Sequence, residues 1–164
     1  MEESIKIFVE RAQLIALNPK YLSCGFVNVT RYERGGSFYV NFEFVNKVLF
    51  SNDATVTMKF FEYRWNKYYR SVVEFHYKFC DFIEKDVYVG TVIGANGLKC
   101  PVKPGKHTVM NVTAHFDDFP SPLPFEKARV NFIFNTSNGD LVAEGAVYFS
   151  VKNNDVKNKK AKRI

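Results

Sequence analysis

The side chains that most often carry out chemistry are few and scattered in this sequence. His76, His107 and His115 stand apart, and no HxH, HExxH or CxxC spacing is present, which argues against a metal site. Asp117 and Asp118 are adjacent, so in a strand they would point to opposite faces and could not share an acid–base role. Motifs for a nucleophilic serine, a phosphate-binding loop and a dinucleotide fingerprint are missing. We therefore predict a protein that is not an enzyme and has no cofactor.

The three cysteines suggest structural chemistry instead. Cys80 falls within a predicted helix, and Cys100 follows a turn rich in Gly and Asn at residues 94–97. Our organising hypothesis is that a bridge from Cys80 to Cys100 fastens this helix to a sheet made by the rest of the chain. The odd count leaves Cys24 as the spare thiol. We expect Cys24 to be a buried structural cysteine, because no histidine close in sequence would activate it.

The segment before Cys80 has a helical pattern of apolar residues. Val72, Phe75, Phe79 and Phe82 recur every three to four positions, with charged residues between them. This spacing predicts one amphipathic helix over residues 72–85.

The rest of the chain alternates apolar and polar residues with the period of two that is typical of strands. Gly, Asn, Asp and Pro separate these segments, as expected for turns. About seven strands are predicted, at residues 5–11, 26–32, 38–44, 56–60, 110–116, 130–134 and 143–151. The inward residues of the fifth would be Met110, Val112, Ala114 and Phe116. The pattern indicates an all-β antiparallel sandwich, like an immunoglobulin domain, with one inserted helix.

The chain carries 17 Phe and 9 Tyr among its 164 residues, and 16% of its residues are aromatic. A large closed β core would use many rings, and so would an apolar cavity lined by them. Composition alone leaves both explanations open.

The net charge of +6 comes largely from the end of the chain. Without Lys157, Lys159, Lys160, Lys162 and Arg163 the formal charge falls to +1, so we predict no nucleic-acid partner. We expect a single domain over residues 1–152, followed by a disordered basic tail over 153–164.

Two features bear on where the protein acts. No apolar run is long enough to span a membrane, and the first residues do not form a signal peptide, so either the protein is cytosolic or Met1 begins a mature chain. Glycosylation sequons begin at Asn28, Asn111 and Asn135, which mildly favours secretion.

Three short motifs carry a resemblance to a known family. They are Phe79-Cys80-Asp81-Phe82-Ile83, then Asn96-Gly97-Leu98-Lys99-Cys100-Pro101, and then the Pro- and Phe-rich loop at residues 119–125. This order resembles ML-domain proteins, the MD-2-related lipid-recognition superfamily. Within it the chain is similar to secreted insect proteins of the ganglioside-activator-like and chemosensory kind. Two departures stand out: no cysteine lies upstream of Cys24 to pair with it, and residues 126–128 lack the Gly-x-Tyr that often follows the loop.

The resemblance implies a Cys80–Cys100 disulfide, secretion, and a sandwich whose sheets separate around an apolar cavity. The protein would then carry a lipid or another apolar small molecule, with a membrane receptor as a further partner. A closed core with a sheet face presented to a receptor, through Tyr39, Tyr63, Tyr68 and Tyr69, is the alternative. For the cavity mouth we expect Phe119, Leu123 and Phe125, unless their loop packs back onto the sheet. The expected ligand-binding residues are Phe42, Phe44, Met58, Phe60, Phe79, Phe116, Phe132, Phe134 and Phe149.

Overall fold

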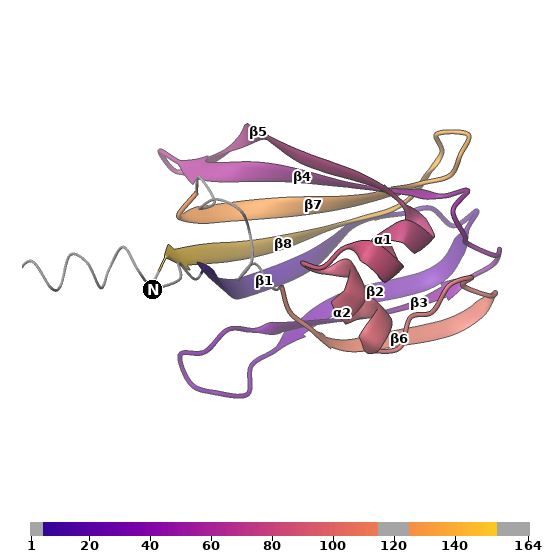
Figure 1. Ribbon diagram of the computed structural model, residues 1–164, viewed down its shortest axis with the longest axis horizontal. Helices are drawn as coiled ribbons and strands as arrows, with labels where there is room; N and C mark the ends of the chain where they lie inside the picture. Colours follow the sequence, from indigo (N-terminus) through magenta and orange to yellow (C-terminus); the bar gives the residue numbers. More distant parts are fainter. Residues whose placement is uncertain (1–4, 115–124, 154–164) are drawn as a thin grey trace, which may run out of the picture.

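Two antiparallel β-sheets pack face to face and form the body of the protein (Figure 1). The computed structural model describes residues 5–114 and 125–153. The five-stranded sheet has the order β1 (Ile5–Leu17), β8 (Leu141–Asn153), β7 (Lys127–Asn135), β4 (Thr55–Arg64) and β5 (Lys67–Lys78). The three-stranded sheet has the order β2 (Leu22–Thr30), β3 (Tyr39–Asn46) and β6 (Gly105–Val112). The predicted all-β antiparallel sandwich is therefore confirmed, with eight strands among the described residues instead of about seven.

The period-two pattern places the core between the sheets. Val56, Met58 and Phe60 of β4 are buried, and the alternate residues of this strand are more exposed. The partners of Met58 and Phe60 on β7 are Phe132 and Val130, which face the same side of the sheet. Each strand thus contributes one apolar face to a shared interior, as the sequence pattern predicts.

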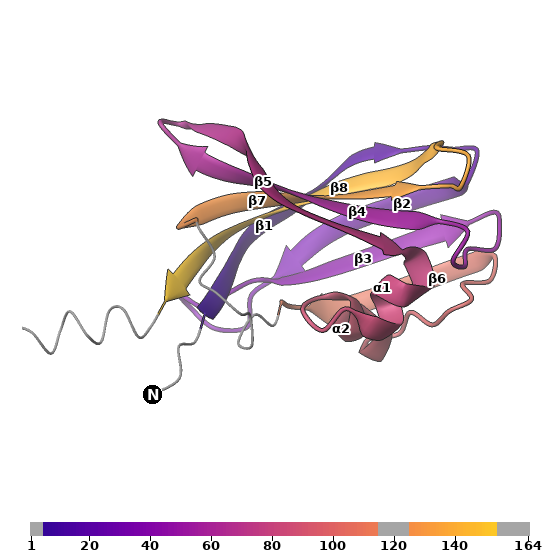
Figure 2. The same cartoon turned by 45° about the horizontal axis from the view of Figure 1, so that its top comes forward.

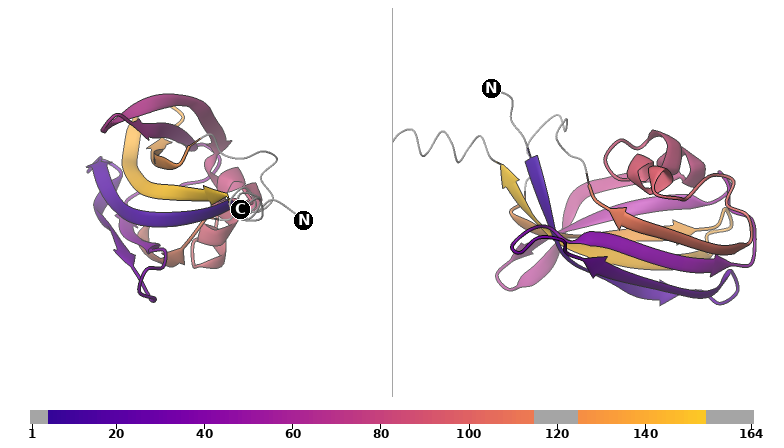
Figure 3. Two further views of the ribbon diagram at one scale, coloured as in Figure 1. Left: turned by 90° about the vertical axis from the view of Figure 1, so that its left-hand side faces the viewer. Right: turned by 90° about the horizontal axis from the view of Figure 1, so that it is seen from below.

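The two long sides of the sandwich are closed differently. On one side β1 lies against β2, and a short turn at residues 18–21 links these strands directly. On the other side two short helices, α1 (Phe79–Lys85) and α2 (Gly90–Ala95), fill the space between β5 and β6 (Figure 2). The end-on view in Figure 3 shows the strongly curved sheets and the helices beside them. The helices therefore act as a wedge between sheet edges that do not pair.

The helix predicted over residues 72–85 is wrong in its first half. Residues up to Lys78 belong to β5, and only Phe79–Lys85 are helical. Phe75 and Tyr77 also fit a period of two, and the Val72–Val73 pair favours a strand because both residues are β-branched. Val72, predicted to be on the apolar face, is fully exposed. Cys80 accordingly lies in the first turn of α1, and a second helix, α2, was not predicted.

The inward face predicted for β6 is also wrong in part. Val112 is buried as expected, but Met110 is 46% exposed and the buried neighbour is Val109. Asn111 has a positive φ of 61°, and the β3–β6 register shifts beside it. This irregularity changes which residues face inward, and a uniform alternation cannot anticipate it.

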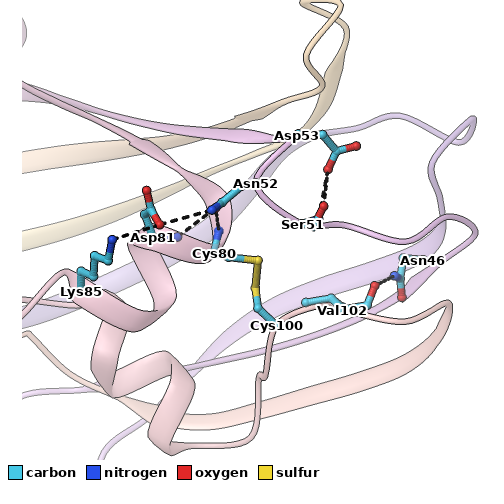
Figure 4. The surroundings of a disulfide bond; sticks show 9 residues. All are labelled: Asn46, Ser51, Asn52, Asp53, Cys80, Asp81, Lys85, Cys100 and Val102. Carbon is cyan, nitrogen blue, oxygen red and sulfur yellow. Dashed lines mark hydrogen bonds and ion pairs between the residues drawn. A yellow bond between two sulfur atoms is a disulfide. The ribbon is translucent and has the colours of Figure 1, made fainter.

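The Cys80–Cys100 disulfide is present, with a Cα–Cα distance of 5.7 Å (Figure 4). The β3–β4 loop holds both ends of the bridged segment. Asn52 Oδ1 accepts hydrogen bonds from the backbone N–H groups of Cys80 at 2.9 Å and Asp81 at 3.1 Å. Beyond Cys100, Phe50 and Val102 exchange two backbone hydrogen bonds. The bridge therefore fixes the helix wedge to a loop that is itself well anchored.

Cys24 is exposed, so its predicted burial is wrong. It lies at a register irregularity of β2, opposite Val45, and the alternation of that strand turns its side chain outward. The predicted tail over residues 153–164 lies outside the described residues apart from the backbone of Asn153.

The turn between β4 and β5 holds a bulky residue in a conformation that favours glycine or asparagine. Trp65 has a φ of 47° and Asn66 a φ of 64°, as in the type I′ turns of two-residue hairpins. Trp65 is also 79% exposed, so packing offsets little of the strain of about 1–2 kcal/mol expected for a side chain at positive φ.

We expect W65N/N66G, which installs the preferred Asn-Gly pair, to raise the free energy of unfolding by about 1 kcal/mol in a urea titration. The control W65F keeps a bulky ring at the same φ and should change stability by less than about 0.5 kcal/mol. A loss of stability in W65N/N66G would show that Trp65 makes contacts that outweigh its backbone strain.

Removing the disulfide should cost substantial stability. The bridge closes a loop with a sequence separation of 20, which predicts a loss of about 3 kcal/mol in C80A/C100A, measured by chemical denaturation. The exposed Cys24 supplies the matched control: C24A should be nearly neutral, and Cys24 alone should react with an alkylating reagent in the folded protein. An equal loss in C24A, or a stable C80A/C100A, would contradict the anchoring role of the bridge.

Candidate functional site

A cavity of about 220 Å³ lies between the two sheets. Its wall is almost wholly apolar and is built by both sheets and both helices. The cavity is larger than an apolar cavity of about 150 Å³ that is known to stay dry and to bind benzene. The interior is therefore not packed solid, and of the two explanations left open by composition the structure favours the one with a void.

Most of the predicted ligand-binding residues lie around this one cavity. They come from four strands and from α1, and they are Phe42, Phe44, Met58, Phe60, Phe79, Phe132, Phe134 and Phe149. Phe116, the remaining residue of that set, lies outside the described residues. Ring contacts join neighbours along the wall, such as Phe79 with Phe134 at a centroid distance of 5.4 Å. Contact of these residues with a ligand stays a prediction.

Sequence reasoning predicted Phe79 of α1 but missed the other wall residues that the helices supply. Phe82 and Ile83 of α1, together with Val89 and Ile93 beside and within α2, line the cavity and are buried. The apolar residues at 89, 92 and 93 have the spacing of a short helix, and this signal was available. Only the turn at residues 94–97 was predicted in this segment.

The predicted mouth residues do not form a mouth that the structure describes. Phe125 is 3% exposed and stacks on Phe60 with a centroid distance of 5.9 Å, and it is not part of the cavity wall. Phe125 therefore packs back onto the sheet, which was the alternative expected for this loop. Phe119 and Leu123 lie outside the described residues.

Two acidic residues, Glu43 and Glu144, stand among those that build the wall, and the alternation of their strands turns both carboxylates away from the cavity. Glu43 accepts a hydrogen bond from Thr108 at 2.9 Å and pairs with Lys106 at 3.5 Å. Glu144 accepts a hydrogen bond from Asn131 at 2.7 Å. Both carboxylates are thus engaged by neighbouring side chains. Among the described residues no group of three or more His, Cys, Asp or Glu could hold a metal ion.

A buried carboxylate holds α2 at the edge of the cavity. Asp86 Oδ2 accepts hydrogen bonds at 2.8 Å from the backbone N–H groups of both Val89 and Gly90, and Oδ1 accepts one from the Tyr77 hydroxyl at 2.7 Å. Burial, followed by this hydrogen bond and the charge of Asp86, raises the pKa of Tyr77 well above its ordinary value. Gly90 fits because a Cβ there would lie 1.8 Å from the Phe82 carbonyl oxygen.

The three sequons differ in accessibility. Asn28 and Asn111 are exposed, whereas Asn135 is half-buried at the end of β7. The side-chain oxygens of Asn28 and Asn111 accept hydrogen bonds from Asn41 at 3.0 Å and Tyr32 at 2.5 Å, respectively. Glycosylation at these sites stays a prediction.

Comparisons with known proteins find a solved structure that is similar to this chain. It is the crystal structure of a Niemann-Pick type C2 protein from Japanese carpenter ant, with 11% sequence identity and a TM-score of 0.30. The alignment covers 89% of this chain and 92% of that chain. No family model matches the sequence, and no curated protein matches it. A likeness at this TM-score does not place the chain in a family, so the resemblance to ML-domain proteins stays a prediction.

The Tyr77–Asp86 contact generates a pH-dependent prediction. Y77F should lower the free energy of unfolding by about 1.5 kcal/mol near neutral pH, because the buried carboxylate of Asp86 loses a hydrogen-bond donor. A raised pKa in the folded state means that the contribution of Tyr77 is complete below its unfolded pKa of about 10 and is lost as the pH rises above that value. Urea titrations at about pH 7 and about pH 11 should therefore show a smaller difference between wild type and Y77F at the higher pH. A difference that is constant with pH would contradict this account.

Proposed function

We propose that this protein is a non-enzymatic carrier of a lipid or another apolar small molecule, held between the two sheets. The observation that carries the proposal is the ring-lined cavity of about 220 Å³. A pocket with an apolar wall and few polar groups binds by removing hydrocarbon surface from water.

The energetic cost of an empty cavity supports the proposal that the cavity holds a ligand. At about 24 cal/mol per Å³, a void of 220 Å³ costs on the order of 5 kcal/mol. This cost is comparable with the net stability of a whole domain, about 5–15 kcal/mol. A chain under no demand to bind would close such a void with larger side chains, so its presence favours a site that is filled during function.

The buried apolar area gives an estimate of the binding free energy. A ligand that buries on the order of 300 Å² of apolar surface gains about 7 kcal/mol before its losses of freedom. This gain sets the upper limit of the affinity in the micromolar range, and it needs few polar contacts. The volume is below the roughly 300–1,000 Å³ that is typical of ligand pockets, so the ligand would be an acyl chain or a small ring system.

The finer parts of the proposal concern setting and family. The disulfide is of the kind that persists in an oxidising compartment, which supports secretion. Membership of the ML-domain superfamily, a chemosensory role and glycosylation are proposed from the sequence motifs alone. In the described part of the chain no helix is long and apolar enough to cross a membrane.

Gly145 offers a way to fill the cavity without disturbing the sheet. It lies on the cavity wall and is paired in register with Phe132 on the neighbouring strand β7. A Cβ at this position would meet only the Gln13 carbonyl oxygen, at 3.6 Å. We expect G145L to lower the affinity for a fluorescent fatty-acid analogue by at least about tenfold, since the added side chain occupies the void. Fluorescence titration measures this loss. The ligand-free variant should unfold at equal or higher urea concentration than wild type.

The matched control, S150L, places the same side chain on the opposite face of β8. It should leave the affinity for the fatty-acid analogue within about twofold of wild type. Native mass spectrometry of the purified protein should show an apolar adduct in wild type and S150L but not in G145L. A wild-type protein that binds no probe and carries no adduct, or a G145L variant that binds as well as wild type, would refute the carrier proposal.

A further inference from the structure

A row of alternating cations and rings crosses the outer face of the five-stranded sheet, on the side away from the cavity. It runs over all five strands in the order Arg11, Tyr148, Arg129, Phe61 and Arg70, and each residue is paired in register with the next. The guanidinium carbon lies over the neighbouring ring at every step. These carbon-to-centroid distances are 3.6 Å from Arg11 to Tyr148, 5.9 Å from Arg129 to Tyr148, 4.1 Å from Arg129 to Phe61 and 5.7 Å from Arg70 to Phe61.

A second, shorter row lies beside the first. Lys127 lies over the ring of Tyr63 at 5.0 Å, and Tyr63 packs against Tyr68 with a centroid distance of 4.9 Å. Tyr68 closes the gap to the first row, at 5.5 Å from the ring of Tyr148 and 5.2 Å from the guanidinium of Arg129. We call these eight residues of the two rows the Arg–Tyr face.

Two of the three guanidinium groups lack a carboxylate partner within the described part of the chain. Arg11 donates to the side-chain oxygen of Gln13 at 3.5 Å, and Arg129 donates to that of Asn131 at 2.8 Å. Both acceptors are neutral amides. Arg70, in contrast, forms an ion pair with Glu74. The positive charges of Arg11 and Arg129 are therefore not neutralised by direct contact.

Besides Glu74, two carboxylates lie near the Arg–Tyr face. Glu144 reaches Arg129 only through Asn131, to which it is hydrogen-bonded at 2.7 Å. Glu10 lies near Tyr68, where its charge is one of the causes, after burial, of a raised Tyr68 pKa. The formal charge of the whole chain without its tail is low, yet this face concentrates cations, so a whole-chain average conceals it.

The composition of the face indicates the kind of partner. A guanidinium stacked on a ring is held in one orientation and still presents its N–H edge, which forms paired hydrogen bonds with a carboxylate. Arginine and tyrosine are also, with tryptophan, the residues enriched at the energetic centres of protein–protein interfaces. A diffuse polyanion or a lipid surface would require positive charge but not this arrangement of rings.

The spacing of the charges adds a geometric condition. Arg11, Arg129 and Arg70 stand on alternate strands, and two strand spacings of about 4.8 Å separate each from the next by roughly 10 Å. Residues i and i+7 on one side of an α-helix are also about 10 Å apart. Acidic residues at that interval would meet successive arginines.

We propose that the Arg–Tyr face is a docking surface for an acidic protein partner, whose carboxylates recur about 10 Å apart as on one side of a helix. The proposal is independent of the carrier function, because the face and the cavity lie on opposite sides of the same sheet. It also specifies which residues and charges would bind the partner in the alternative in which a sheet face is presented to a receptor.

The test uses two labelled helical peptides of identical composition, one with glutamates at positions i, i+7 and i+14 and one with the same glutamates adjacent to one another. Fluorescence polarisation with the full chain should show the spaced peptide binding at least about threefold tighter than the clustered one. R11Q/R129Q should weaken the spaced peptide at least about tenfold. R11K/R129K should also weaken it measurably, because lysine keeps the charge but loses the planar fork.

The matched control K99Q/K103Q removes two exposed lysines of the α2–β6 segment and lowers the net charge equally. It should leave peptide binding within about twofold of wild type. Binding of the fatty-acid analogue should be unchanged in R11Q/R129Q, which separates this proposal from the carrier function. Equal affinity for both peptides would overturn the proposal. So would a loss of affinity for the spaced peptide in K99Q/K103Q as large as that in R11Q/R129Q, or wild-type affinity for this peptide in R11K/R129K. Tighter binding to heparin or to phosphatidylserine vesicles than to the spaced peptide would overturn it as well.

Discussion

The structure depends on keeping two aromatic-rich sheets from closing completely upon each other. Sheets that pack fully leave few voids larger than a water molecule, yet here about 220 Å³ of apolar space remains. The wedge of α1 and α2 between β5 and β6 prevents closure on one side, and the Cys80–Cys100 bridge holds that wedge in place. Asp86 contributes within the wedge, because its carboxylate fixes the backbone where α2 begins. Without these anchors the hydrophobic effect would favour collapse of the void.

The two faces of the five-stranded sheet differ in the side chains that they carry. Along β8, Val147 and Phe149 line the cavity, whereas Tyr148 between them faces outward under the guanidinium of Arg11. The inner face is apolar, as the interior of a sandwich and the proposed lipid site both require. The outer face holds cations over rings, which keeps the aromatic surface covered while leaving positive charge available to a partner. One strand therefore contributes to both proposed binding sites, and the two sites share none of its side chains.

The sequence predicted the fold class and most of the cavity wall because both follow from a local period of two. Phe132 and Phe134 in β7, or Met58 and Phe60 in β4, alternate cleanly enough to identify their inner face. The errors fall where two periods coexist. The spacing of Phe75, Phe79 and Phe82 satisfies a helix, but the chain changes from strand to helix within this interval, at Phe79. Only the pairing of β5 with β4, a contact made through the fold, decides between the two.

The Arg–Tyr face could not be predicted for a related reason. Its residues are dispersed from position 11 to position 148 and are brought together by strand order, which periodicity does not determine. The tyrosines at 63, 68 and 69 gave part of the signal, but Arg11 and Arg129 come from other strands. The phase change at Asn111 is similar, since a single residue at positive φ turns Val109 inward in place of Met110. Long-range register, more than residue type, limited what the sequence could show.

An apolar cavity of this kind has limited means of choosing its ligand. Its wall offers volume and shape, and one methylene more or less is worth only about 1 kcal/mol of discrimination. The carboxylates of Glu43 and Glu144 are bonded to Thr108, Lys106 and Asn131 on the outer faces of the sheets, so they add little selectivity for a ligand. Biological specificity would then have to come from where the protein delivers its ligand. A carrier that selects poorly by its cavity gains most from a separate surface that selects its destination, and the outer face of the sheet is the part of the molecule with the charge pattern to do so.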